Sequence, residues 1–204
     1  MYQCILASGS PRRKEILEQC GIAFRIEKSD AEEVITKTRP SDVVMELSEV
    51  KALEVAERVK ETECIIIGAD TIVANGEAIL GKPKDETEAC AMINSLQGHE
   101  HSVYTGVTLV IRRGGKQEVI TFYEETKVEI IAMIEDEIKD YVKSGEPMDK
   151  AGAYAIQGLF AGNVKGIRGD YYNVVGLPIC AILQKLRKAG INLKKDCKSL
   201  EKLG

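Results

Sequence analysis

The chain has 204 residues, of which 44% are hydrophobic and 29% charged, a composition typical of a globular enzyme with a sizeable core. Its net charge of -4 argues against sequence-independent binding to a nucleic-acid polymer or a membrane surface. No apolar run reaches membrane-spanning length and the N-terminal run is too short for a signal peptide, so we expect a cytoplasmic protein.

The chain opens with a short apolar run that predicts a buried strand and then continues into a helical pattern. Ser10 suits the N-cap of that helix, and Pro11 suits its first position, where a missing N–H costs nothing. Arg12 and Arg13 follow at once, although the positive end of a helix disfavours cations. An anion bound between these arginines and the helix end removes the conflict, and phosphate is the best candidate.

The rest of the chain alternates strand and helix patterns, which predicts an α/β fold with a mixed sheet flanked by helices. The helix near residue 42 is expected to have Ser41 as its cap, and Asn75-Gly76 indicates a hairpin turn. No linker divides the sequence, so we expect a single domain over residues 1–204, with residues 194–204 as a solvated tail. The predicted strands are residues 2–7, 23–27, 64–67, 102–112 and 117–131, and the predicted helices are residues 11–20, 42–60, 85–98, 135–143 and from 178 onward.

Cysteine and histidine are expected to play structural parts. The six cysteines show no C-x-x-C spacing and mostly lie in apolar patterns, which favours buried, reduced thiols. The histidines are His99 and His101 alone, in a polar stretch that offers no further metal ligands. Any catalysis is therefore expected to rest on carboxylates and cations.

Two charged residues stand where apolar or turn residues are usual. Lys51 interrupts the apolar stripe of its helix, either as a lysine that extends to solvent or as one that faces an anionic ligand. Asp70 is expected to end the strand that begins at Cys64, either as a turn cap or as a catalytic acid at the carboxyl end of a strand.

Two further charged residues are candidates for the same site. Lys82 lies in a Gly-Lys-Pro tripeptide that holds it away from a strand end, as a phosphate ligand or a plain surface lysine. Glu33 lies in an acidic loop, which is usually a solvated face. With Asp70 nearby, however, the two carboxylates could share a divalent cation.

In order and spacing, these residues resemble the Maf (septum formation inhibitor-like) nucleotide pyrophosphatases over almost the whole chain. The resemblance implies an α/β fold like that of inosine triphosphate pyrophosphatases, with an elongated mixed sheet and two lobes around a cleft. It is compatible with a homodimer. The matching segments are Ser8 to Arg13, Glu33, Lys51, Ala69 to Thr71, Gly81 to Pro83, Thr105 to Val107, Asp149 to Gly158 and Asn173 to Pro178.

The resemblance also implies an activity, the cleavage of a nucleoside triphosphate to the monophosphate and pyrophosphate with Mg²⁺ or Mn²⁺. Asp70 would be the general base, and Glu33 would help it to hold the metal. The resemblance further implies that Glu33, Lys51 and Lys82 are catalytic residues together with Asp70. The residues that it implies as substrate contacts are Ser8, Ser10, Arg12, Arg13, Thr71 and Gln157.

Gln157 matches the position that marks the dTTP/UTP branch of the family. A carboxamide can accept from the pyrimidine N3–H and donate to O4 of uracil or thymine. After Gly158 the family usually has further small residues and then an aromatic, whereas this chain has Leu159, Phe160, Ala161 and Asn163. Two alternatives remain: a nucleotide-binding regulator of cell division with little turnover, and a phosphatase that releases single phosphates.

Overall fold

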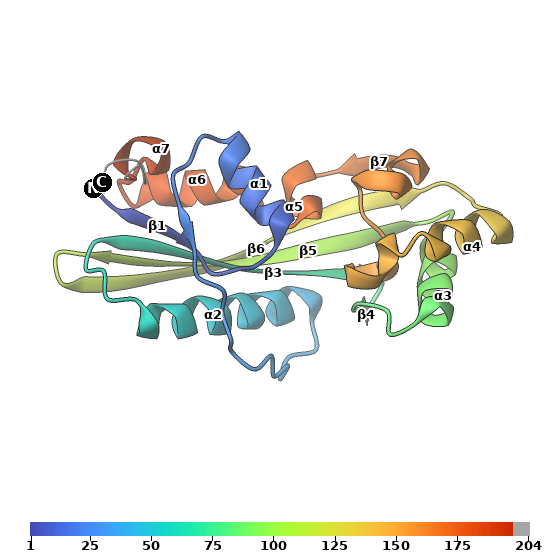
Figure 1. Cartoon of the computed structure of the whole chain (residues 1–204), viewed down its shortest axis with the longest axis horizontal. Helices are drawn as coiled ribbons and strands as arrows, with labels where there is room; N and C mark the ends of the chain where they lie inside the picture. Colours follow the sequence, from blue (N-terminus) through green and yellow to red (C-terminus); the bar gives the residue numbers. More distant parts are fainter. Residues whose placement is uncertain (198–204) are drawn as a thin grey trace. The chain divides into compact units, whose positions relative to one another are not determined.

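The computed structural model describes residues 1–197 and has the predicted α/β class (Figure 1). Seven strands form one mixed sheet in the order β2-β1-β3-β5-β6-β7, with β4 paired to β3. Pairing is parallel around β1 and antiparallel between β3 and β4 and between β6 and β7. The strands are β1 (Gln3–Leu6), β2 (Arg25–Ile26), β3 (Cys64–Asn75), β4 (Ala78–Leu80), β5 (Glu100–Arg113), β6 (Lys116–Ile130) and β7 (Val164–Arg168).

The five predicted helices lie close to their expected positions, whereas α5 and α7 were not predicted. Two starts match the expected residues, since α1 begins at Pro11 and the Asp85 side chain caps α3 by accepting from the backbone N–H of Glu88 at 2.8 Å. The helices are α1 (Pro11–Gln19), α2 (Pro40–Arg58), α3 (Glu86–Leu96), α4 (Glu135–Lys143), α5 (Tyr171–Val175), α6 (Ile179–Lys188) and α7 (Leu193–Asp196), with 3₁₀ turns at Glu146–Asp149, Ala151–Ala153 and Gly158–Asn163.

Two sequence predictions about element ends are wrong. Ser41 does not cap α2, because the helix begins one residue earlier at Pro40, with Arg39 as its N-cap. Asp70 does not end its strand either, because β3 continues to Asn75. The parallel pairing of β3 with β1 does stop at Ile67, and Asp70 lies just past that point. Of the predicted tail, residues 194–196 belong to α7, and residues 198–204 lie outside the described part.

The chain divides into two compact units, and the long strands β3, β5 and β6 contribute residues to both. The first unit comprises residues Met1–Asp70, Thr105–Glu124 and the described chain from Gly176. In it, α2 covers one face of the sheet while α1 and α6 lie on the other (Figure 1). The α2 face is packed by apolar side chains from the helix and from β1, β3 and β5.

The second unit comprises Thr71–Tyr104 and Glu125–Val175. Its core joins α3, α4 and the 3₁₀ turns to the ends of the long strands. Phe160, from the loop that departs from the family pattern, is fully buried there. Its ring lies 4.9 Å from that of Tyr141 and 5.1 Å from that of Tyr154. Phe160 thus anchors this loop with an aromatic ring. No helix in the described chain is long and apolar enough to span a membrane.

Candidate active site

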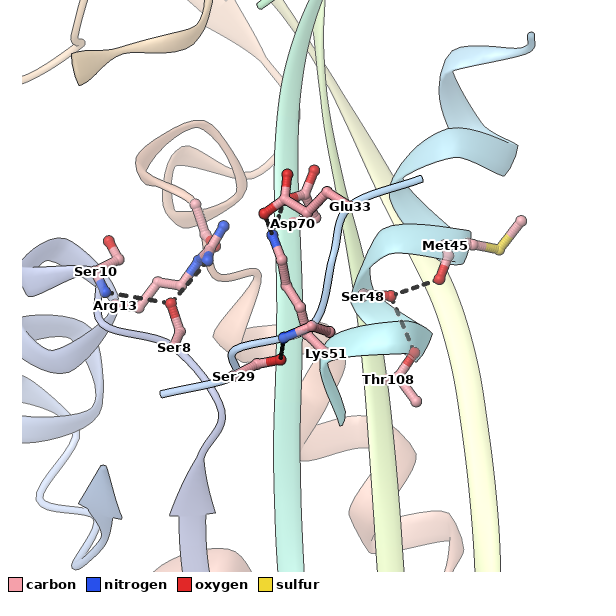
Figure 2. Close-up of polar contacts among 12 residues, drawn as sticks. Ser8, Ser10, Arg13, Ser29, Glu33, Met45, Ser48, Lys51, Asp70 and Thr108 are labelled. Carbon is pink, nitrogen blue, oxygen red and sulfur yellow. Dashed lines mark hydrogen bonds and ion pairs between the residues drawn. The ribbon is translucent and has the colours of Figure 1, made fainter. Parts of the chain in front are cut away.

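A lysine between two carboxylates forms the centre of the candidate site in the first unit (Figure 2). The Nζ atom of Lys51 lies 2.5 Å from Oδ1 of Asp70 and 2.9 Å from Oε1 of Glu33. The side chains of Lys51 and Asp70 are only 15% and 13% exposed, whereas that of Glu33 is 55% exposed. Lys51 therefore does not extend to solvent, and it brings together two acids that are far apart in the sequence.

The close approach of α2 to the sheet places Lys51 at this position. Gly68 precedes Asp70 by two residues on β3, and a Cβ atom there would lie 2.5 Å from the carbonyl oxygen of Ser48. On the side of α2 that faces the sheet, the Ser48 hydroxyl donates to the Met45 carbonyl oxygen and is hydrogen-bonded to the Thr108 hydroxyl on β5 at 3.0 Å. The glycine and these buried hydroxyls hold α2 close enough for Lys51 to reach Asp70.

Arg13 is the second cationic element of the site. It belongs to the first turn of α1, and its Nη1 atom donates to the hydroxyl of Ser8 at 2.9 Å. Its Nε atom donates to the carbonyl oxygen of Gly176 at 2.8 Å. The Ser8 oxygen also accepts from the backbone N–H of Ser10 at 3.2 Å. Ser8 and Gly176 therefore fix the orientation of the guanidinium on two sides.

The electrostatic environment links Arg13 to the carboxylates. Burial lowers the pKa of the Arg13 guanidinium, and the neighbouring charge of Arg12 acts in the same direction. The charges of Asp70 and Glu33 oppose both effects. An arginine keeps its proton throughout the range in which proteins work, so the group remains a cation. Ser10 is the N-cap of α1 as predicted, although its side chain makes no capping hydrogen bond within the described residues.

The second unit contains the other three predicted site residues, Thr71, Lys82 and Gln157. Thr71 continues β3, Lys82 is exposed in the loop after β4, and Gln157 is partly buried before the last 3₁₀ turn. The carbonyl oxygen of Gly81 accepts from the backbone N–H of Gly152 at 3.0 Å, which fixes the backbone next to Lys82. The predicted convergence of these residues with those of the first unit stays a prediction.

Sequence reasoning missed Glu146, which anchors the loop that carries Gln157. One carboxylate oxygen accepts from the hydroxyl of Tyr141 at 3.1 Å, and the other accepts from the backbone N–H of Leu159 at 3.0 Å. Gly158 fits over this carboxylate, because a Cβ atom there would lie 2.5 Å from Oε2. The only sequence signal is a glutamate beside a glycine in a segment rich in small residues.

His101 is structural in this unit. Its side chain is 3% exposed, and its Nε2 atom lies 2.6 Å from the hydroxyl oxygen of Tyr154. Burial lowers the pKa of the imidazole to about 4, with a smaller contribution from the charge of Lys127. The ring is therefore neutral at pH 7.

Among the described residues, no group of three or more histidine, cysteine or acidic side chains is arranged to hold a metal.

Comparison with known proteins identifies relatives over nearly the whole chain. The model of the family described as Maf-like protein matches residues 3–189. A dTTP/UTP pyrophosphatase of Lachnoclostridium phytofermentans is 55% identical over 197 residues, which is 96% of this chain and 100% of that protein. A dTTP/UTP pyrophosphatase of Agathobacter rectalis is 52% identical over 205 residues, with 95% and 100% covered.

A solved structure also matches part of the chain. The Ham1 protein of Staphylococcus aureus is 15% identical and aligns with a TM-score of 0.39 over 63% of this chain and 71% of its own.

Proposed function

Because this chain belongs to the Maf family, we propose that it hydrolyses dTTP and UTP to the nucleoside monophosphate and pyrophosphate. The two relatives named dTTP/UTP pyrophosphatase are 55% and 52% identical to this chain over almost its whole length. The observation that carries the proposal is the contact of Lys51 with both Asp70 and Glu33. It gathers an acid–base group and a cation in one place, as hydrolysis of a charged anhydride requires.

Asp70 would act as the general base. Its carboxylate would take a proton from the water that attacks the α-phosphorus, and pyrophosphate would leave. Lys51 holds this carboxylate at 2.5 Å and fixes its orientation. The same ammonium group offers positive charge beside the carboxylate, where it would stabilise the charge that develops on the phosphate oxygens. Lys82 would also bind and neutralise the phosphates of the substrate.

The loop from Ser8 to Arg13 would hold the phosphate chain. Arg13 presents a guanidinium whose Nε and Nη1 groups are already bonded to Gly176 and Ser8. A side chain oriented in advance loses less freedom when it binds an anion. Ser10 and Arg12 stand at the N-terminal end of α1, where backbone N–H groups and the helix dipole favour phosphate.

A divalent cation fits the donor set of this unit. Carboxylate oxygens of Glu33 and Asp70 both lie within 3 Å of the Lys51 Nζ atom, so the two carboxylates are close enough together to coordinate a single cation. Mg²⁺ and Mn²⁺ accept one or two carboxylates together with phosphate oxygens and water. Glu33 and Asp70 would hold the ion. When bound, it would withdraw electron density from the phosphate oxygens.

Gln157 would select the base. Its side-chain oxygen would accept from the N3–H of uracil or thymine, and its nitrogen would donate to O4. Glu146 supports this role because it fixes the adjacent backbone at Leu159. A base without the matching donor and acceptor leaves a polar group of the pocket unpaired, which is how such a pocket discriminates.

The test is a panel of nucleoside triphosphates with Mg²⁺ or Mn²⁺, scored for pyrophosphate and orthophosphate. We expect pyrophosphate as the product, with dTTP and UTP preferred. Asp70→Asn should lower kcat by more than about a hundredfold while nucleotide binding survives. Asp140→Asn, on the exposed face of α4, is the matched control and should keep wild-type turnover.

Three outcomes would contradict the proposal. Release of orthophosphate alone would indicate a phosphatase. Tight binding of nucleotide by the wild-type protein without turnover would favour a regulatory role. Wild-type turnover in Asp70→Asn would remove Asp70 from the reaction.

A further inference from the structure

Two cysteines that are far apart in the sequence lie side by side in the first unit. Cys4 is the second residue of β1, and Cys197 follows α7 at the end of the described chain. Cys197 pairs with the residue that precedes β1, because Tyr2 and Cys197 form a parallel bridge. The backbone N–H of Tyr2 donates to the carbonyl oxygen of Asp196 at 2.7 Å.

This pairing puts both thiols on one face of the sheet. Side chains alternate along a strand, so Tyr2 and Cys4 point the same way, and Cys197 points that way too as the partner of Tyr2. Cys4 is 0% exposed and Cys197 is 7% exposed. The two thiols are hydrogen-bonded to one another, and both are free. They therefore interact in a site that is largely closed to solvent.

The two thiols are not equivalent. The hydrogen bond to Cys197 is the largest cause that raises the pKa of Cys4, and burial adds to it. The same hydrogen bond is the largest cause that lowers the pKa of Cys197. Both directions fit a Cys4 S–H that donates to the sulfur of Cys197. Cys197 is also the more exposed of the two thiols, and since the thiolate is the reactive form, we take Cys197 as the nucleophile of the pair.

We propose that Cys4 and Cys197 form a modification site, a dithiol that a small disulfide such as glutathione disulfide oxidises to an intramolecular disulfide. The Cys197 thiolate attacks one sulfur of the oxidant, forms a mixed disulfide and releases one thiolate. Cys4 then loses its proton and attacks the sulfur of Cys197, which forms the Cys4–Cys197 bond and expels the second thiolate. The two protein thiols are oxidised, and one small disulfide is reduced to two thiols.

The sheet excludes the nearest competing cysteine. Cys64 on β3 is paired with Gln3, so its side chain projects from the opposite face to that of Cys4. It packs under α2 with Ile5 and Ala7, and its sulfur donates to the carbonyl oxygen of Glu61 at 3.4 Å. Cys64→Ser is therefore a matched control, because it removes a thiol on the neighbouring strand β3 and leaves both Cys4 and Cys197 in place.

The experiment treats the full-length protein with glutathione disulfide, blocks remaining thiols with N-ethylmaleimide in denaturant, and maps unreduced peptides by mass spectrometry. We expect a peptide that joins Cys4 to Cys197, in at least about tenfold excess over any other disulfide of Cys4, because the folded chain holds the two sulfurs in contact. Cys64→Ser should give the same product. Cys197→Ser should leave Cys4 as a maleimide-blocked thiol.

Unfolding provides a second measurement that does not depend on peptide mapping. The disulfide closes a loop over nearly the whole chain, so the oxidised protein should have a higher midpoint of thermal unfolding than the reduced protein. Treatment of Cys197→Ser should not raise its midpoint. The proposal fails if Cys4 remains a free thiol in the oxidised wild type, if a mixed disulfide at Cys197 persists as the end product, or if Cys4 pairs indiscriminately.

Discussion

A Cβ atom on Gly106 would lie 2.1 Å from the carbonyl oxygen of Val44, so the α2 backbone rests directly on strand β5. Gly68 makes the equivalent contact on β3, below Ser48. Neither contact can relax by moving a flexible side chain, because both partners are backbone atoms. The distance of α2 from the sheet, and with it the reach of Lys51, is therefore set at two glycines.

Replacement of Gly106 by alanine should displace α2. The methyl group would overlap the helix backbone, and we expect the free energy of unfolding to fall by about 2–4 kcal/mol. Turnover of dTTP should fall as well, because Lys51 would move away from Asp70. Denaturant unfolding and steady-state kinetics measure the two effects. Gly166→Ala, where a Cβ would meet open space, should change stability by less than about 0.5 kcal/mol.

Ser8→Ala should weaken nucleotide binding more than it slows the chemical step. The change removes the acceptor of the Arg13 Nη1 group and of the Ser10 N–H. Without these hydrogen bonds Arg13 is no longer held in place, and we expect the binding free energy of the nucleotide to weaken by about 1–2 kcal/mol. KM for dTTP should then rise about tenfold, while kcat should stay within about threefold of the wild-type value. Ser95→Ala, on the outer part of α3, is the control. An unchanged KM in Ser8→Ala would show that Ser8 does not position Arg13.

Glu146→Ala should reduce the preference for uracil and thymine. Without the carboxylate, the backbone N–H of Leu159 and the Tyr141 hydroxyl lose their acceptor, and the loop beside Gln157 loosens. We expect kcat/KM for dTTP and UTP to fall by about tenfold or more relative to a purine triphosphate. Glu146→Gln keeps one acceptor oxygen and should be intermediate. Glu135→Gln on α4 should leave the preference unchanged, and an equal loss for all bases would contradict a role in selection.

Acid should destabilise the protein through His101. Burial lowers the pKa of this imidazole to about 4 from an ordinary value of 6.5, so the unfolded chain binds a proton that the folded chain does not. The free energy of unfolding should therefore fall as the pH decreases from 6.5 to 4, by about 3 kcal/mol in all from this group. Denaturant titrations at several pH values measure the slope.

The matched variants isolate the histidine from the carboxylates that titrate in the same range. His101→Gln keeps a hydrogen-bond partner for Tyr154 and should show a shallower dependence of stability on pH. His99→Gln, at an exposed position, should keep the wild-type slope. Equal slopes in all three proteins would assign the acid sensitivity to other groups.

Local signals in the sequence accounted for most of the fold. Pro11, the Asp85 cap and the Asn75-Gly76 turn each act within a few residues, and the structure confirms all three. The predictions at Ser41 and Asp70 were wrong for two different reasons. Pro40 takes the first position of α2, which leaves Ser41 inside the helix. Antiparallel pairing with β4 extends β3 beyond Asp70.

By itself, the sequence determined the α/β class, most of the helices and strands, the family and the identities of the charged residues, because periodicity and short motifs record local preferences. Only the tertiary structure decided that Lys51 joins Glu33 to Asp70, that Ser8 and Gly176 hold Arg13, and that Cys4 touches Cys197. Those contacts depend on how closely α2 approaches the sheet and on which segment pairs with β1. Such distances arise from packing between segments that no local pattern encodes.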